Sequence, residues 1–237
     1  MAVFTNIIII IFTIGVSYLL GSISNATIWT KKYANVDIRT LGSKNAGFTN
    51  VIRTVGGKAA LCTFIGDFLK GLVSVAIGKY LFLNFFVAGN IDIFLLSKIG
   101  AYIAGVSCVI GHIYPCFFQF KGGKGVLTTA SIVLMIDWRV FLISIGVFLI
   151  VLLITRVMSI SSICGATMFP ISTFFLTYFV DYLPNKGIEN APSLSYVVFS
   201  TSMAVMIGAC IIFMHKANIK RLINGTEPKF TVKKKEK

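Results

Sequence analysis

The sixteen residues GHIYPCFFQFKGGKGV, numbers 111 to 126, interrupt a long apolar sequence with a proline, several glycines and two lysines. Glycine has no Cβ, so backbone N–H groups beside it can approach a ligand closely, and two ammonium groups supply positive charge. The segment is therefore interpreted as an anion-binding loop, with phosphate as the expected anion. Its residues are Lys121, Gly122, Gly123, Lys124 and Gly125. The alternative is a solvated turn whose lysines only set the membrane topology.

This loop is not a nucleotide-binding P-loop. That motif needs a glycine five residues before the Gly-Lys pair and a serine or threonine directly after it. Phe118 and Gly125 occupy those two positions. ATP is therefore not the expected ligand.

The overall composition is that of a membrane protein whose helices bury one another. The chain has 237 residues, a mean hydropathy of +0.87 and only 13% charged residues, which is unlike a water-soluble domain. Several apolar runs approach the roughly 20 residues that cross a bilayer as a helix. We therefore predict an all-α, polytopic membrane protein in which residues 1–237 form a single integral membrane domain.

The formal charge of +14 comes from basic residues that cluster beside the expected membrane spans. In such positions lysine and arginine set the orientation of the protein and attract anionic headgroups or anionic substrates. The predicted partners are therefore small anionic substrates and membrane lipid, and nucleic acid is not expected.

Neither the cysteines nor the histidines predict a cofactor. The five cysteines are odd in number and stand in apolar surroundings, as small core residues do. With only two histidines in the chain, no metal-ligand cluster is visible. No metal or other cofactor is predicted.

Seven spans are predicted, with the N-terminus outside the cell and the C-terminus in the cytoplasm. Basic residues gather in four segments that together hold 17 of the 22 lysines and arginines: 31–58, 121–124, 156 and 216–237. The positive-inside rule places all four in the cytoplasm. The spans are expected at residues 3–28, 59–83, 98–115, 126–136, 140–155, 159–180 and 194–214.

The stretch 126–155 can be read as one long helix or as two spans that meet at residues 137–139. One helix would place Arg156 and the basic C-terminal tail outside the cell, whereas two spans bring all large basic clusters to one side. We favour two spans. Eleven residues at ~1.5 Å each cover only about half of the hydrocarbon, so the fourth span is expected to be short, tilted or partly re-entrant.

The first polar segment, residues 31–58, places hydroxyl and amide side chains between glycines and beside six cations. Such groups suit a polyhydroxylated or phosphorylated ligand, because they donate and accept several hydrogen bonds at once. Asn45, Thr49 and Asn50 are the candidate binding residues here, and Ser43 and Arg53 are candidate catalytic residues, as His215 and Asn218 are near the C-terminus.

Three further candidates lie in or beside the later spans. Asp67 and Lys70 are three residues apart within an apolar helix, so they are expected to form a structural ion pair. Ser159 begins the sixth span, where it either caps the helix or contacts the substrate. His215 and Asn218 share the spacing of one helical face at the cytoplasmic end of the seventh span.

In residues 37–53, 67–71, 111–126 and 215–227, the chain resembles the bacterial membrane acyl-phosphate:glycerol-3-phosphate acyltransferases. The resemblance covers nearly the whole chain in order. It implies seven transmembrane helices in the cell membrane, with an outward N-terminus and an active site on the cytoplasmic side. The implied reaction transfers a fatty acyl group from acyl phosphate to the 1-hydroxyl of glycerol 3-phosphate, giving lysophosphatidate and inorganic phosphate in the first step of phospholipid synthesis.

The same resemblance implies roles for individual residues. Ser43 and Arg53 belong to its first motif, and the glycine loop at 122–125 is implied to bind the phosphate of glycerol 3-phosphate. His215, Asn218 and Glu227 belong to the third motif, in which Glu227 is implied to be more structural than catalytic.

The residue types fit this chemistry. Acyl phosphate is already activated, so an enzyme must mainly hold two phosphate-bearing substrates together and orient the hydroxyl. Arg53, Lys121 and Lys124 offer the charge, and either His215 or a phosphate oxygen of the substrate is the proton acceptor. The alternative function is a transporter or channel for a phosphorylated solute, which would more often place its polar groups at the membrane midplane.

Overall fold

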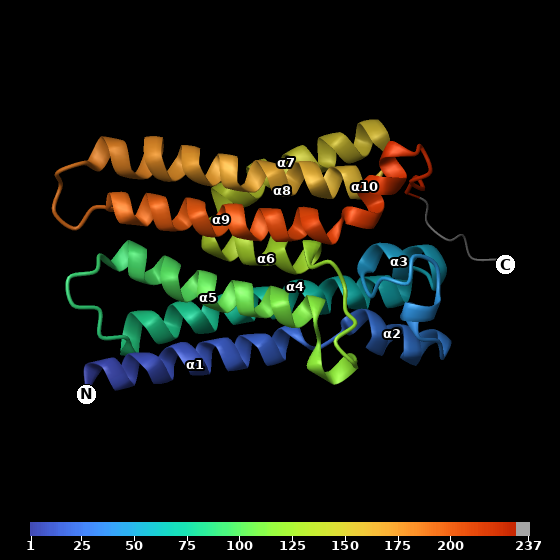
Figure 1. Ribbon diagram of the computed structural model, residues 1–237, viewed down its shortest axis with the longest axis horizontal. Helices are drawn as coiled ribbons and strands as arrows, with labels where there is room; N and C mark the ends of the chain where they lie inside the picture. The colour runs from blue at the N-terminus through green and yellow to red at the C-terminus, as the bar shows by residue number, and fades with distance from the viewer. Residues whose placement is uncertain (231–237) are drawn as a thin grey trace.

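The computed structural model describes residues 1–230 of the chain, and the regular structure in this part is helical, without β-strands. The long helices run lengthwise beside one another (Figure 1). The helices are α1 (Ala2–Gly21), α2 (Asn25–Ala34), α3 (Phe48–Thr54), α4 (Gly57–Phe85), α5 (Ile93–Ile113), α6 (Val126–Ile136), α7 (Trp138–Thr155), α8 (Met158–Phe175), α9 (Leu194–Met214) and α10 (Lys216–Ile223). A π-helical segment, Leu176–Tyr182, continues α8.

By length and composition, six segments of the described chain can cross a membrane. They are Ala2–Ala34, Gly57–Phe85, Ile93–Phe118, Trp138–Thr155, Met158–Asn185 and Leu194–Met214. Helix α6 is a shorter apolar helix of 11 residues. The expected division of 126–155 into two helices is confirmed, because the helical run breaks at Asp137.

The expectation of one continuous helix over residues 3–28 was wrong. The chain leaves the helix after Gly21 and starts α2 at Asn25. The break frees backbone carbonyls, and the ammonium group of Lys70 binds two of them, those of Gly21 and Ile23, each at 2.9 Å. A buried lysine in α4 therefore replaces the helical hydrogen bonds that are lost at this break.

All the basic segments of the described chain gather at one end of the bundle, which we call the basic end. Figure 1 shows α2, α3, α10 and the glycine loop at this end, and the N-terminus with the loops around 86–92 and 183–193 at the other. The sequence-based grouping of the basic segments on one side is thus reproduced for residues 1–230. The charged tail from Lys233 to Lys237, which belongs to the same prediction, lies outside the described residues.

The long helices form two packed groups. Helices α1, α4, α5 and α6 pack together, and α7, α8 and α9 form the second group (Figure 1). Small residues allow the closest contacts in the first group: a Cβ added at Gly78 or Gly100 would overlap the backbone of the facing helix. The functional cavity lies where the two groups face each other.

Buried charged side chains make the short helix α6 possible within an apolar environment. Its last carbonyls, those of Met135 and Ile136, accept hydrogen bonds from the ammonium groups of Lys79 and Lys98. Carbonyl groups at a helix end have no intrahelical partner and attract positive charge, and leaving them unpaired in hydrocarbon is costly. The two lysines therefore stabilise the end of α6.

Asp137 then starts the next helix. Its carboxylate accepts the backbone N–H of Arg139 at 3.0 Å and pairs with the guanidinium group, which also reaches Asp181 at 2.8 Å. The helix reversal between α6 and α7 is thus held by compensated charges.

Candidate active site

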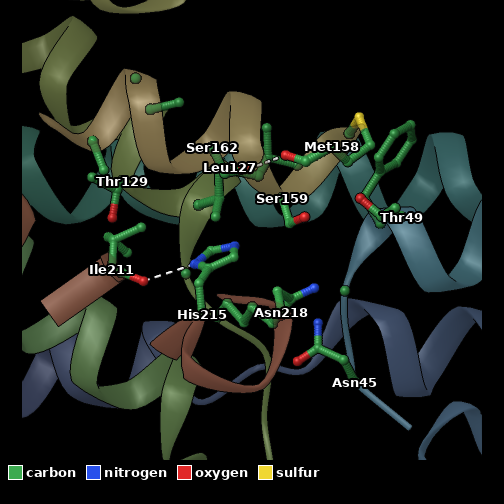
Figure 2. Close-up of a pocket in the computed structure, with 18 of the residues that line it drawn as sticks. Asn45, Thr49, Leu127, Thr129, Met158, Ser159, Ser162, Ile211, His215 and Asn218 are labelled. Carbon is green, nitrogen blue, oxygen red and sulfur yellow. Dashed lines mark hydrogen bonds between the residues drawn. The ribbon is translucent and has the colours of Figure 1, made fainter. Parts of the chain in front are cut away.

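A cavity of about 840 Å³ opens at the basic end between the two helix groups. Its walls combine three segments that are far apart in sequence: residues 42–54, the stretch from Lys124 to Val133, and residues 208–228. Figure 2 shows side chains from each segment meeting there, including Asn45, Thr129, His215 and Asn218, together with Ser159 at the start of α8. The tertiary structure therefore unites most of the residues that the sequence analysis singled out.

The first segment forms a tight turn that is built around Asn50. The Asn50 amide group donates to the carbonyls of Leu41 at 2.9 Å and Asn45 at 3.1 Å, and its oxygen accepts the Ser43 N–H at 3.1 Å. Asn50 is only 4% exposed, so its side chain is occupied in shaping the turn. Asn50 therefore shapes the turn, and it also lines the cavity, so its expected role in substrate binding stays a prediction.

The other residues of this segment face the cavity. Ser43, Asn45 and Thr49 line its wall, together with Ser159 at the start of α8. Arg53 also lines it, and one of its terminal nitrogens donates to the carbonyls of Pro228 and Lys229 at 3.3 Å. Arg53 therefore connects α3 to the C-terminal segment across the mouth of the cavity.

The glycine loop is placed differently from the expectation. Lys124 and Gly125 line the cavity, whereas Lys121, Gly122 and Gly123 do not, and Lys121 is exposed. The N–H groups of Gly122 and Gly123 donate to the carbonyls of Ile113 and His112, at 3.1 and 3.2 Å. These N–H groups are therefore occupied, and the idea that they bind an anion directly is not supported by the geometry.

The need for glycine at these positions has another cause. A Cβ at Gly122 would overlap the His112 carbonyl oxygen, and one at Gly123 would overlap the His112 ring and approach the Ala46 carbonyl. Gly125 has φ +79°, a conformation that L side chains rarely adopt. The glycines let the loop pack against the end of α5, and this packing places Lys124 in the cavity wall.

Lys124 heads a chain of polar contacts. Its ammonium group contacts the Asn218 oxygen, the Asn218 amide donates to Glu227 at 2.6 Å, and Arg221 donates to the same carboxylate at 2.6 Å. Burial, together with the nearby positive charges of Arg221 and Arg53, lowers the pKa of Lys124 to about 8, although Glu227 opposes the change. Glu227 thus accepts hydrogen bonds from two residues of α10, and its structural role stays a prediction.

Glu227 itself stays ionised. Burial opposes its ionisation, but the hydrogen bonds from Asn218 and Arg221 outweigh that effect and hold its pKa below the ordinary value. A permanently charged Glu227 compensates part of the positive charge that gathers around the cavity.

His215 is buried at the junction of α9 and α10, with 2% of its surface exposed. Its Nδ1 lies 2.7 Å from the carbonyl oxygen of Ile211 (Figure 2). Because a carbonyl can only accept, Nδ1 carries the proton and Nε2 is left as an acceptor. Burial lowers the pKa of His215 to about 4, an effect that the Ile211 contact opposes, so the ring is neutral near pH 7.

Asp67 and Lys70 form the predicted ion pair, 3.0 Å apart and almost fully buried. Asp67 also accepts from Asn25 at 3.1 Å, and Lys70 binds the α1 break described above. The pair therefore ties α4 to the α1–α2 junction, as a structural pair would.

His112 and Arg221 were not predicted as site residues, although both line the cavity. His112 is 8% exposed, and its Nδ1 lies 3.8 Å from Asp67 and 3.4 Å from the Thr128 hydroxyl. The available signal was its place three residues before Pro115, at the start of the segment that contains the glycine loop. Arg221 gave a weaker signal, because exposed arginines at helix ends are common.

Comparison with known proteins agrees with this geometry. The family model described as glycerol-3-phosphate acyltransferase matches residues 10–225. A glycerol-3-phosphate acyltransferase of Clostridioides difficile (strain 630) is 38% identical over 234 residues, which is 99% of this chain and all of the relative. One from Thermoanaerobacter sp. (strain X514) is 37% identical over 92% of this chain and 94% of its own length.

A solved structure has the same fold. The crystal structure of PlsY (YgiH), an integral membrane glycerol 3-phosphate acyltransferase in its glycerol 3-phosphate form, superposes with a TM-score of 0.74 at 34% identity. It covers 94% of this chain, and the match spans 96% of that protein. The family model, the relatives and this structure show that the chain belongs to the glycerol-3-phosphate acyltransferase family.

Proposed function

We propose that this enzyme transfers a fatty acyl group from acyl phosphate to the 1-hydroxyl of glycerol 3-phosphate, and releases lysophosphatidate and inorganic phosphate. Membership of the glycerol-3-phosphate acyltransferase family supports the acceptor and the reaction type. The acyl-phosphate donor follows from the resemblance of the sequence motifs.

The observation that carries the proposal is the mixed chemistry of one cavity. Its end at the basic end of the bundle holds Arg53, Lys124 and Arg221 with several hydroxyl and amide groups. Its other part, between α6 and helices α7 to α9, is lined mainly by apolar side chains, with a few hydroxyl groups. Such a cavity suits two substrates that carry phosphate, one of which also carries a long acyl chain.

The reaction needs positioning and charge more than a covalent nucleophile. Phosphate is a good leaving group, so the enzyme must bring the donor carbonyl carbon next to the 1-hydroxyl and stabilise the negative charge of both substrates. The three cations supply that charge in a partly buried site, where an ion pair is stronger than in water. Ser43, Asn45, Thr49 and Ser159 offer hydrogen bonds to the glycerol and phosphate oxygens.

The proton of the 1-hydroxyl has two possible acceptors. As the new ester bond forms, the C–O bond to phosphate breaks and the hydroxyl proton must leave. Nε2 of His215 is an unprotonated acceptor at the cavity wall, and a phosphate oxygen of the substrate is the alternative. If His215 accepts the proton, the imidazolium later returns it to solvent or to the released phosphate. If a phosphate oxygen accepts it, the proton leaves with inorganic phosphate or remains on the phosphate of lysophosphatidate.

We further propose seven membrane passes in a bacterial cell membrane. Helix α6 is the short fourth pass, the N-terminus is outside, and the basic end with the active site faces the cytoplasm. The gathering of basic segments at one end of the bundle supports this orientation.

Purified protein in detergent or nanodiscs, supplied with palmitoyl phosphate, tests the function. Phosphate release that depends on glycerol 3-phosphate, with equal formation of lysophosphatidate, is expected. Release without the acceptor, or no product from either substrate pair, would contradict the proposal. An Arg53→Met and Lys124→Met double variant is the inactive control, and palmitoyl coenzyme A in place of palmitoyl phosphate tests the donor class.

A further inference from the structure

The cavity continues from its polar end into an apolar limb between α6 and the second helix group. The side chains that line this limb include Ala130, Val133, Phe141, Phe148, Ala166 and Phe169. They come from α6, α7 and α8. The hydroxyl side chains of Thr129, Ser144 and Ser162 on these helices also line the cavity, but none of the lining residues of these helices is charged. The limb is therefore suited to a saturated hydrocarbon tail.

On each of four helices, the lining of the limb ends at one residue. The lining residues farthest from the basic end are Val133 on α6, Phe141 on α7, Phe169 on α8 and Gly208 on α9. From Ser159 to Phe169 the helix advances ten residues, or about 15 Å at ~1.5 Å per residue. The limb thus reaches roughly half of the ~30 Å hydrocarbon thickness.

Closely packed side chains form the floor. Phe169 is 3% exposed and Val133 is 4% exposed, and both belong to the main apolar core of the protein, against which Phe141 packs. A close-packed floor of this kind does not extend easily, because core side chains leave little free volume. Helix α9 comes close to α8 at this level, where a Cβ at Gly208 would lie 2.7 Å from the Ala166 carbonyl.

We infer that Phe169, together with Val133 and Phe141, sets the maximum length of the acyl chain that this enzyme transfers. The inference rests on the proposed function, since it takes the occupant of the limb to be the acyl chain of acyl phosphate. That occupant is argued from the continuity of the limb with the polar end of the same cavity, where the phosphate cations lie. The reactive carbonyl then stays at the polar end while the chain end meets the floor.

The test compares acyl phosphates of 12 to 20 carbons at fixed glycerol 3-phosphate. In Phe169→Ala the floor is removed, so the chain length with the highest kcat/KM should increase by two carbons or more. The ratio of kcat/KM between the longest and the shortest donors should change by about tenfold, since a methylene group that does not fit a pocket typically costs at least that. In Ala130→Leu a larger side chain stands one helical turn above Val133, and the preferred length should decrease.

The matched control is Phe199→Ala. Phe199 packs against the same apolar core but does not line the cavity, so its loss should reduce stability without changing the preferred chain length. Equal length profiles in the wild type, Phe169→Ala and Ala130→Leu would overturn the inference, as would an equal shift in Phe199→Ala. If Phe169→Ala does not accumulate in the membrane, the preferred chain length of Ala130→Leu tests the inference alone. An unchanged preferred length in that variant would overturn it.

A second readout separates this inference from the proposed reaction. Unreactive alkylphosphonates of increasing length should raise the Tm of the purified protein up to a limiting length, and Ala130→Leu should lower that limit. Such a limit without acyl transfer would support the limb and refute the reaction. Transfer without any length limit would support the reaction and refute the limb.

Discussion

Within the active site, His215 is the residue whose chemistry the structure defines most closely. Its Nδ1–H donates a hydrogen bond to the Ile211 carbonyl, which leaves Nε2 as the acceptor. Burial lowers the pKa of His215 to about 4. If His215 is the base, its active neutral form is present above pH 4 and is lost as the pH falls through that value. The acidic limb of the wild-type rate at saturating substrate is then expected near pH 4, well below the ordinary histidine value of about 6.5.

The variant that tests this role is His215→Asn, which can still donate to Ile211 but has no basic nitrogen. We expect the maximal rate to fall by about 10²- to 10⁴-fold, as for loss of a positioned base. His215→Ala should lose additional stability, since the Ile211 contact is also gone. A full maximal rate in His215→Asn, with only a raised KM, would assign the proton to the substrate phosphate.

The titration of Lys124 predicts a loss of activity at high pH, whereas that of His215 predicts a loss at low pH. Burial lowers the pKa of Lys124 to about 8, so its charge is complete below that value and is lost as the pH rises through it. We expect kcat/KM for glycerol 3-phosphate to fall as the pH rises above about 8, and Lys124→Arg to move this limb to higher pH because guanidinium remains charged. The matched control is Lys121→Met, which removes an exposed lysine of the same loop outside the cavity and should leave the profile unchanged.

Gly122→Ala separates a packing role from phosphate binding. The added Cβ would overlap the His112 carbonyl, so the loop must move away from α5. We expect a loss of about 1–3 kcal/mol in stability with a lower maximal rate, as for other overpacked sites. Gly146→Ala, where nothing lies within 4 Å of the new atom, is the control. Unchanged Tm with only a raised KM for glycerol 3-phosphate would restore the anion-cradle interpretation.

Among the helices, α6 depends most on side chains from its neighbours. Lys79 of α4 and Lys98 of α5 bind its last carbonyls, and loss of one such charged donor leaves a buried acceptor unpaired. We expect Lys98→Met to lower the free energy of unfolding by about 1–3 kcal/mol. Lys186→Met, on an exposed loop, should have no effect.

Amide hydrogen exchange locates that loss. Faster exchange at residues 133–137 in Lys98→Met is expected, while α9 stays protected. If exchange and Tm of Lys98→Met equal those of the wild type, the cap does not stabilise α6. This result would also weaken the case for α6 as a separate fourth pass.

For the whole molecule, orientation in the membrane is the central prediction. Single cysteines at 44 and 187, in a background without the five native cysteines, lie in exposed segments at opposite ends of the bundle. A membrane-impermeant thiol reagent added to intact cells should label position 187 and reach position 44 only after the membrane is opened. Labelling of position 44 from outside would invert the proposed topology.

Sequence alone determined the helical membrane class, the grouping of the basic segments and the buried Asp67–Lys70 pair. Hydropathy and charge act locally along the chain, and an i, i+3 spacing places two side chains on the same helical face wherever the helix goes. The division between α6 and α7 also followed from charge, because only two spans bring all the large basic clusters to one side. The family motifs pointed to His215, Asn218 and Lys124 before their positions were known.

Only the tertiary structure decided how these residues are used. The N–H groups of Gly122 and Gly123 are not free, because carbonyls at the end of α5 accept hydrogen bonds from both. The Asn50 amide is likewise occupied by the carbonyls of the turn that it stabilises. The break after Gly21 depends on Lys70 of another helix. The apolar limb is lined by residues of four helices, α6 to α9. The first two features depend on how a loop folds back on its own neighbours, and the last two on contacts between residues far apart in sequence. The periodicity of hydropathy and charge encodes neither.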